Sequence, residues 1–206
     1  MKISNIIFIL TVICTLSCKS NNAKDPIVEK NKKEEKRIEL TAETILSKIP
    51  TLSTPFEIDY IKDKEALKKL QENSVELTLN EIKILLPKHE LFPNMSGEPR
   101  PTNFFKFELD GLKLVGTFQI KFDSPNSYTN YLQMQLLKNG QTIGDEFKIP
   151  FEGGAYSGGL ISSAFITREL ITFRKISNQA DSNGSTKIVS DEKETFVIKE
   201  NGIFKK

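Results

Sequence analysis

NFFKFELDGLKLVGTFQIKF, residues 103–122, is the stretch that decides the fold. In its first half every second residue is apolar, which is typical of a strand with one buried face. An Asp-Gly pair at 110–111 follows, and this pair favours a tight two-residue hairpin turn. The second half, residues 112–122, alternates again. The stretch therefore predicts a β-hairpin.

The same pattern continues toward the C-terminus. Residues 128–137 and 143–151 alternate, and Asn139-Gly140 marks a second hairpin between them. Further strands are predicted at 160–167, 170–177, 186–189 and 195–199. About eight short strands spaced about 8–12 residues apart predict an antiparallel meander over residues 103–206. Periodicity does not decide whether this β-domain forms a barrel, a sandwich or a propeller-like fan.

Residues 39–102 predict a smaller mixed segment packed on the main domain. A helix is expected at 41–49 with Thr41 as its N-cap. The other expected elements are a strand at 56–61, helices at 62–72 and 80–86, the latter capped by Asn80, and a loop at 88–102. The expected fold class is α+β and mostly β, with short N-terminal helices before the meander.

The first eighteen residues, MKISNIIFILTVICTLSC, have the layout of a secretory signal. The apolar run at 6–16 is shorter than the ~18–20 residues that span a bilayer as a helix. The end of the stretch resembles the lipobox of bacterial lipoprotein signals, although Thr15 stands where that family usually has Leu. The resemblance implies removal of residues 1–17 and attachment of diacylglycerol to the thiol of Cys18. Two other interpretations remain: a secretory signal with a free Cys, or a buried helix.

Residues 18–38 are polar and carry a run of mixed charge at 30–37, which predicts a flexible tether. Lys19 follows the cysteine, and the absence of Asp there resembles the outer-membrane default of lipoprotein sorting. The expected location is the bacterial cell envelope. The chain would be anchored to the outer membrane by lipid on Cys18, so the bilayer itself is one expected partner.

Composition excludes several classes of function. The net charge of the 206-residue chain is +2, too small to steer nucleic acid, so no nucleic-acid partner is expected. The only cysteines are Cys14 and Cys18, so the mature domain has no thiol for a disulfide or a zinc site. No metal and no cofactor are expected.

No catalytic set is predicted either. His89 is the only histidine, no G-x-S-x-G elbow accompanies it, and it is interpreted as a surface loop residue. The glycine-rich stretch EGGAYSGG at 152–159 lacks the lysine of a phosphate loop. It is expected to be a break between strands, either a flexible connection or a bulge that gives clearance between them. Tyr156 and Ser157 at its tip are candidate contact residues. Residues 181–185 are expected to form a turn.

The leading hypothesis is a non-enzymatic, membrane-tethered binding or interaction module with a protein or glycan partner. One alternative is an immunity or inhibitor lipoprotein that blocks a toxin or lysozyme. Another is a hydrolase that uses carboxylates alone. The Lys/Asn/Ile-rich composition and the tail VIKENGIF at 197–204 resemble uncharacterised envelope lipoproteins of Bacteroidetes-type bacteria.

Overall fold

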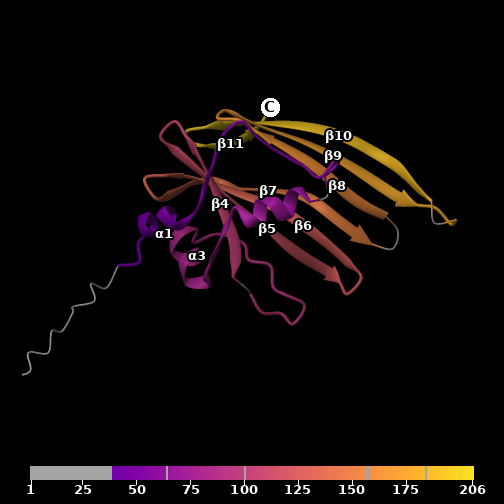
Figure 1. The fold of residues 1–206 in the computed structure, drawn as a ribbon, viewed down its shortest axis with the longest axis horizontal. Coiled ribbons are helices and arrows are strands. Elements are labelled where there is room, and N and C mark those ends of the chain that lie inside the picture. Colours follow the sequence, from indigo (N-terminus) through magenta and orange to yellow (C-terminus); the bar gives the residue numbers. More distant parts are fainter. Residues whose placement is uncertain (1–38, 64, 100, 156–157, 184) are drawn as a thin grey trace, which may run out of the picture. The chain divides into compact units, whose positions relative to one another are not determined.

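The computed structural model describes residues 39–206 except 64, 100, 156–157 and 184. Residues 38–206 form one compact unit. The described residues fold into a mixed sheet of eleven strands with three short helices, so the expected mostly β fold is confirmed. Figure 1 shows the helices on the sheet and the long strands of the C-terminal half running side by side.

Eight strands make the antiparallel meander. They are β4 (Thr102–Leu109), β5 (Leu112–Ser124), β6 (Ser127–Lys138), β7 (Gln141–Ala155), β8 (Gly158–Ile166), β9 (Leu170–Ala180), β10 (Thr186–Lys199) and β11 (Gly202–Lys205). The deciding stretch forms the β4–β5 hairpin, whose pairing starts at Leu109 and Leu112 on either side of the predicted Asp-Gly turn. Gly111 in that turn has a φ of +78°, which favours glycine.

Two expectations for this half were wrong. The strands expected at 186–189 and 195–199 are one strand, β10, because its charged middle continues to pair with β9 past a bulge at Val189. The glycine-rich stretch is not a break between strands: residues 152–155 of β7 pair with residues 158–161 of β8. Backbone pairing does not require apolar side chains, so the alternation rule missed both.

The N-terminal segment adds three strands to the same sheet. The two-residue β1 (Thr51–Leu52) pairs parallel with residues 106–107 of β4. β3 (Val75–Leu77) pairs antiparallel with residues 102–104, at the N-terminal end of β4. The predicted strand at 56–61 is β2 (Phe56–Asp59), which pairs with β8. The sheet is therefore mixed rather than purely antiparallel. Strands of two or three residues are too short for a periodicity to predict them.

The three helices are α1 (Ala42–Lys48), α2 (Ala66–Glu72) and α3 (Leu79–Leu85). Thr41 caps α1 as predicted, in a capping box with Thr44. The N-cap of α3 is Thr78 rather than Asn80, because Thr78 and Glu81 form a reciprocal capping box. Within the described part of the chain, no helix is long and apolar enough to cross a membrane.

The sheet buries apolar side chains on both faces. On one face, the buried apolar side chains of β4–β9 form a cluster with Leu67 and Leu70 of α2 and Ile58 of β2. On the other face, Phe104 and Val115 pack against α1 and α3. Each large side chain buried in this way stabilises the fold by about 1.5–3 kcal/mol.

The sheet forks at β8. Residues 158–161 of β8 pair with β7, whereas residues 163–166 pair with β2. Among the described residues, β7 pairs only with β6 from Ile143 to Pro150, so this length of β7 separates from β8. The sheet is not closed, which excludes the barrel alternative. β11, at the other end of the sheet, returns to β7 at Gly144 and Gly202.

Candidate functional site

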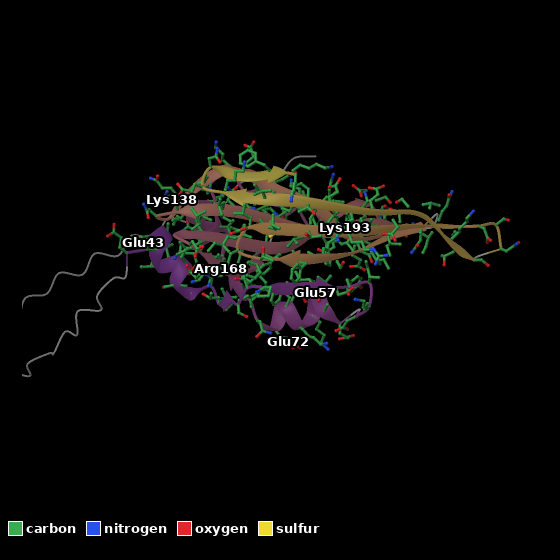
Figure 2. All side chains as sticks on the ribbon, turned by 90° about the horizontal axis from the view of Figure 1, so that it is seen from above. Glu43, Glu57, Glu72, Lys138, Arg168 and Lys193 are labelled. Atoms are coloured by element: carbon green, nitrogen blue, oxygen red, sulfur yellow. The ribbon has the colours of Figure 1, made fainter. Side chains whose placement is uncertain are left out.

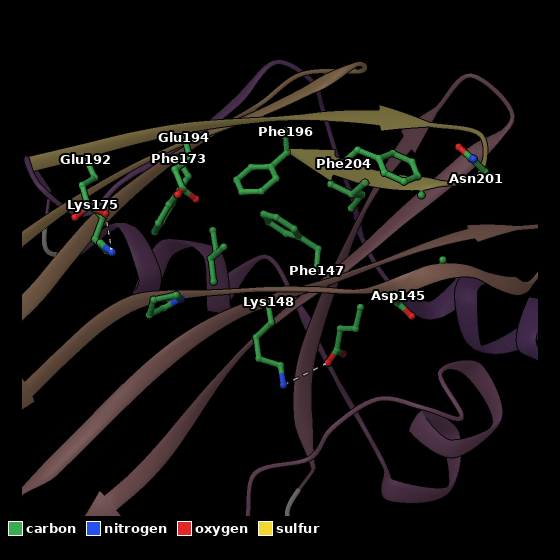
Figure 3. Close-up of a pocket in the computed structure, with 16 residues that line it drawn as sticks. Asp145, Phe147, Lys148, Phe173, Lys175, Glu192, Glu194, Phe196, Asn201 and Phe204 are labelled. Atoms are coloured by element: carbon green, nitrogen blue, oxygen red, sulfur yellow. Dashed lines mark ion pairs between the residues drawn. The ribbon is translucent and has the colours of Figure 1, made fainter. Parts of the chain in front are cut away.

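The fork leaves a cavity of about 570 Å³ between β7 on one side and β9, β10 and β11 on the other. Figure 3 shows Phe147 and Phe196 pointing toward one another across it, whereas Lys148 points away from it. Its apolar lining is contributed by Phe147, Ile149, Phe173, Phe196, Ile203 and Phe204. The volume lies in the ~300–1,000 Å³ range of small-molecule sites.

Strand periodicity places these aromatic rings in the cavity. Phe147 of β7 and Phe196 of β10 meet across it, with ring centroids 4.6 Å apart and ring planes at 70°. This edge-to-face contact is a favourable geometry for an aromatic pair. Both side chains are only half-buried, unlike Phe173 deeper in the core. The two sides of the fork thus meet through aromatic side chains rather than through a backbone ladder.

Charged side chains surround this apolar interior in pairs. The Nζ atom of Lys175 of β9 lies 3.0 Å from a carboxylate oxygen of Glu192 of β10, and Figure 3 marks this ion pair. Glu194 lies 2.6 Å from Lys205 of β11. Lys148 points to the opposite side of β7 from Phe147, where it contacts Glu146 at 3.9 Å and also Glu90 (Figure 3). At the rim itself, Glu192 and Glu194 each have a lysine partner, and Asp145 adds a further carboxylate.

His89 does not lie free on the surface, so the interpretation of it as a surface loop residue was wrong. Its side chain is only 2 % exposed. Its Nδ1 atom contacts the carboxylate of Glu146, and its Nε2 atom lies 2.7 Å from the amide nitrogen of Gln119. Both ring nitrogens are therefore occupied by structural contacts.

Gln119 extends this network to the loop that carries His89. Its amide oxygen accepts a hydrogen bond from the backbone N–H of Phe92 at 3.0 Å. Its amide nitrogen donates to the carbonyl of Glu90 at 3.1 Å and to the side chain of Gln133 at 2.6 Å. These buried polar contacts fix the loop on the sheet.

A cluster of two tyrosines and one glutamate lies on the face of the sheet that α2 covers. The hydroxyls of Tyr60 and Tyr128 donate to one oxygen of Glu152, at 3.2 and 2.9 Å. Burial, and then the charge of Glu152, raises the pKa of Tyr60 to about 12. Burial likewise raises the pKa of Tyr128. Both tyrosines therefore remain protonated donors at neutral pH.

Three predicted site residues, Cys18, Tyr156 and Ser157, lie outside the described residues. Beside the last two, Gly158 has a φ of +153°, and a Cβ there would lie 2.1 Å from the carbonyl oxygen of Asn178. Close approach of two strands therefore explains a glycine at this position.

The turn expected at 181–185 is confirmed for its described residues, which exclude 184. The carboxylate of Asp181 accepts hydrogen bonds from the backbone N–H groups of Asn183 and Ser185, at 2.8 and 2.9 Å. In the part of the chain that the structure describes, no three His, Cys, Asp or Glu residues are placed to hold a metal ion.

Sequence reasoning missed the cavity. Phe147 and Phe196 fall in the alternating pattern of two strands, and that pattern is the same whether a face packs in a core or lines a cavity. Comparison of the chain with protein-family models, with curated proteins and with solved structures found no match.

Proposed function

We propose that this chain is an envelope lipoprotein, anchored through acylated Cys18, that binds an amphipathic small molecule without transforming it. The observation that carries the proposal is the cavity between β7 and β9–β11, with its half-buried aromatic interior and its charged rim. An apolar part of the ligand would lie against the paired rings of Phe147 and Phe196. A polar part would remain at the rim near Lys175.

The ion pairs of the rim favour binding over acid–base catalysis. A carboxylate-based hydrolase needs one carboxyl group that holds a proton and one that is free to attack. Glu192 and Glu194 already contact lysines at 3.0 and 2.6 Å, so neither carboxylate is free to attack a substrate. These groups are better suited to orient a ligand than to react with it.

The proposal can be tested with the fluorescent probe 1-anilinonaphthalene-8-sulfonate and the full chain carrying Cys18→Ala. Saturable fluorescence enhancement is expected, because the aromatic cavity shields the probe from water. Phe196→Ala should weaken the binding about tenfold, since it removes one of the two facing rings.

Phe165→Ala is the matched control, because Phe165 is 42 % exposed on β8 and does not line the cavity. It should leave probe binding unchanged. Equal losses in the two variants, or no saturable binding in the starting protein, would contradict the cavity as the ligand site.

A further inference from the structure

A second pocket, of about 330 Å³, lies at the edge of β5. The pairing of β4 with β5 ends at Phe104 and Thr117, so β5 runs on past the start of β4. The pocket occupies this position and is also bounded by α2 and β3. Its lining includes Gln71, Glu76, Phe92, Asn103, Phe118 and Asn130. None of these residues lines the cavity at the fork.

Asn130 of β6 is the unusual member of this lining. It is only 6 % exposed and pairs in register with Ile120 of β5 and Glu152 of β7. Its side-chain oxygen is buried and has no hydrogen-bond partner within the described part of the chain. An unsatisfied buried acceptor destabilises the folded chain. Less than 1 Å² of this oxygen is exposed, so a donor bound in the pocket would remove that cost once the Asn130 side chain turns toward it.

The chemistry of the lining narrows the identity of this donor. Side-chain amides from Gln71 and Asn103 both donate and accept hydrogen bonds, as hydroxyl groups do. Phe92 and Phe118 provide apolar surfaces. Among the described residues that line the pocket, the one charged side chain is that of Glu76, which is exposed. The lining therefore includes no cation that would attract an anionic ligand.

We propose that this pocket binds an uncharged hydroxylated ring of the size of a monosaccharide. One hydroxyl of the sugar donates to the side-chain oxygen of Asn130. The C–H face of the ring packs against Phe118, and the remaining hydroxyls bond to the amides of the lining. The pocket is separate from the cavity at the fork, so either site can fail without the other.

The test uses the isotope-labelled full chain in nanodiscs, titrated separately with glucose, galactose and N-acetylglucosamine. At least one sugar should shift the side-chain amide resonances of Asn130 and Asn103 in a saturable way. Asn130→Leu keeps a side chain of similar size and removes the acceptor. It should weaken binding of that sugar about tenfold.

Asn126→Leu is the matched control, because Asn126 lies exposed in the β5–β6 turn outside the pocket. It should not change the affinity. If Asn130→Leu fails to fold, the amide shifts of the unaltered chain still decide the matter. No saturable shift with any of the three sugars would overturn the proposal, as would a crystal structure grown with them that shows only a water on Asn130.

Discussion

Gly144 of β7 and Gly202 of β11 meet backbone to backbone. A Cβ on Gly144 would lie 3.1 Å from the Cα of Gly202 and 3.2 Å from the carbonyl oxygen of Asn201. Gly144 also has a φ of +64°, in the left-handed region. This contact brings the last strand of the sheet back to β7 at one end of the aromatic cavity. Two residues without side chains are what allow the strands to come so close.

Gly144→Val should destabilise the protein by about 2–4 kcal/mol, because it combines backbone strain with steric overlap. Urea unfolding measures the change. Gly97→Val is the control, since Gly97 has a φ of +88° but nothing within 4 Å of a Cβ. Its loss of stability should reflect the backbone strain alone, without the steric overlap. Equal losses in the two variants would mean that the β7–β11 contact adds nothing to stability.

Gly116 of β5 is a second position where packing requires glycine. A Cβ there would lie 2.6 Å from the ring of Phe105, which is fully buried. Gly116→Ala should cost about 1–3 kcal/mol by overpacking the core. Phe105→Leu in the same chain should relieve part of that cost, so the two substitutions should combine less than additively. Strictly additive losses in denaturant unfolding would refute this steric explanation.

Glu81 makes stability depend on pH. Hydrogen bonds from Lys48 and from the Thr78 cap lower its pKa from 4.5 to about 2 in the folded chain. A lowered folded pKa contributes stability that is fully present above pH 4.5 and is lost as the pH falls toward 2. The contribution should be about 1–2 kcal/mol.

Glu81→Gln should remove this contribution and flatten the pH profile of the unfolding free energy in that window. Glu43→Gln, at an exposed position in the first turn of α1 (Figure 2), serves as the comparison. The idea fails if the two variants have the same pH profile.

Lipidation of Cys18 is a prediction from the sequence. Cys18→Ala should abolish labelling by a fatty-acid analogue and release the protein from membranes, because two or more acyl chains are needed for a stable anchor. Cys14→Ala, in the expected signal segment, should leave the label in place. Label that persists in Cys18→Ala would place the lipid elsewhere.

Local patterns predicted most of the individual elements. Thr41 and the Asp110-Gly111 pair are signals that act over a few residues, and the structure has the helix start and the hairpin where they predict them. The cap of α3 was misplaced by two residues, because Thr78 and Asn80 are both good N-caps. The choice between them depends on the partner carboxylate of Glu81. The burial of His89 was missed because its partners, Glu146 and Gln119, are distant in the sequence.

By itself, the sequence determined the mostly β class, the hairpin turns and the strand faces, because alternation and turn chemistry are local properties of the chain. Tertiary structure alone decided where the sheet forks, which phenylalanines line a cavity, and which buried amide oxygen has no partner among the described residues. Those features depend on which strand edges meet across long stretches of sequence. A one-dimensional pattern records which face of a strand is apolar, but it does not record what packs against that face.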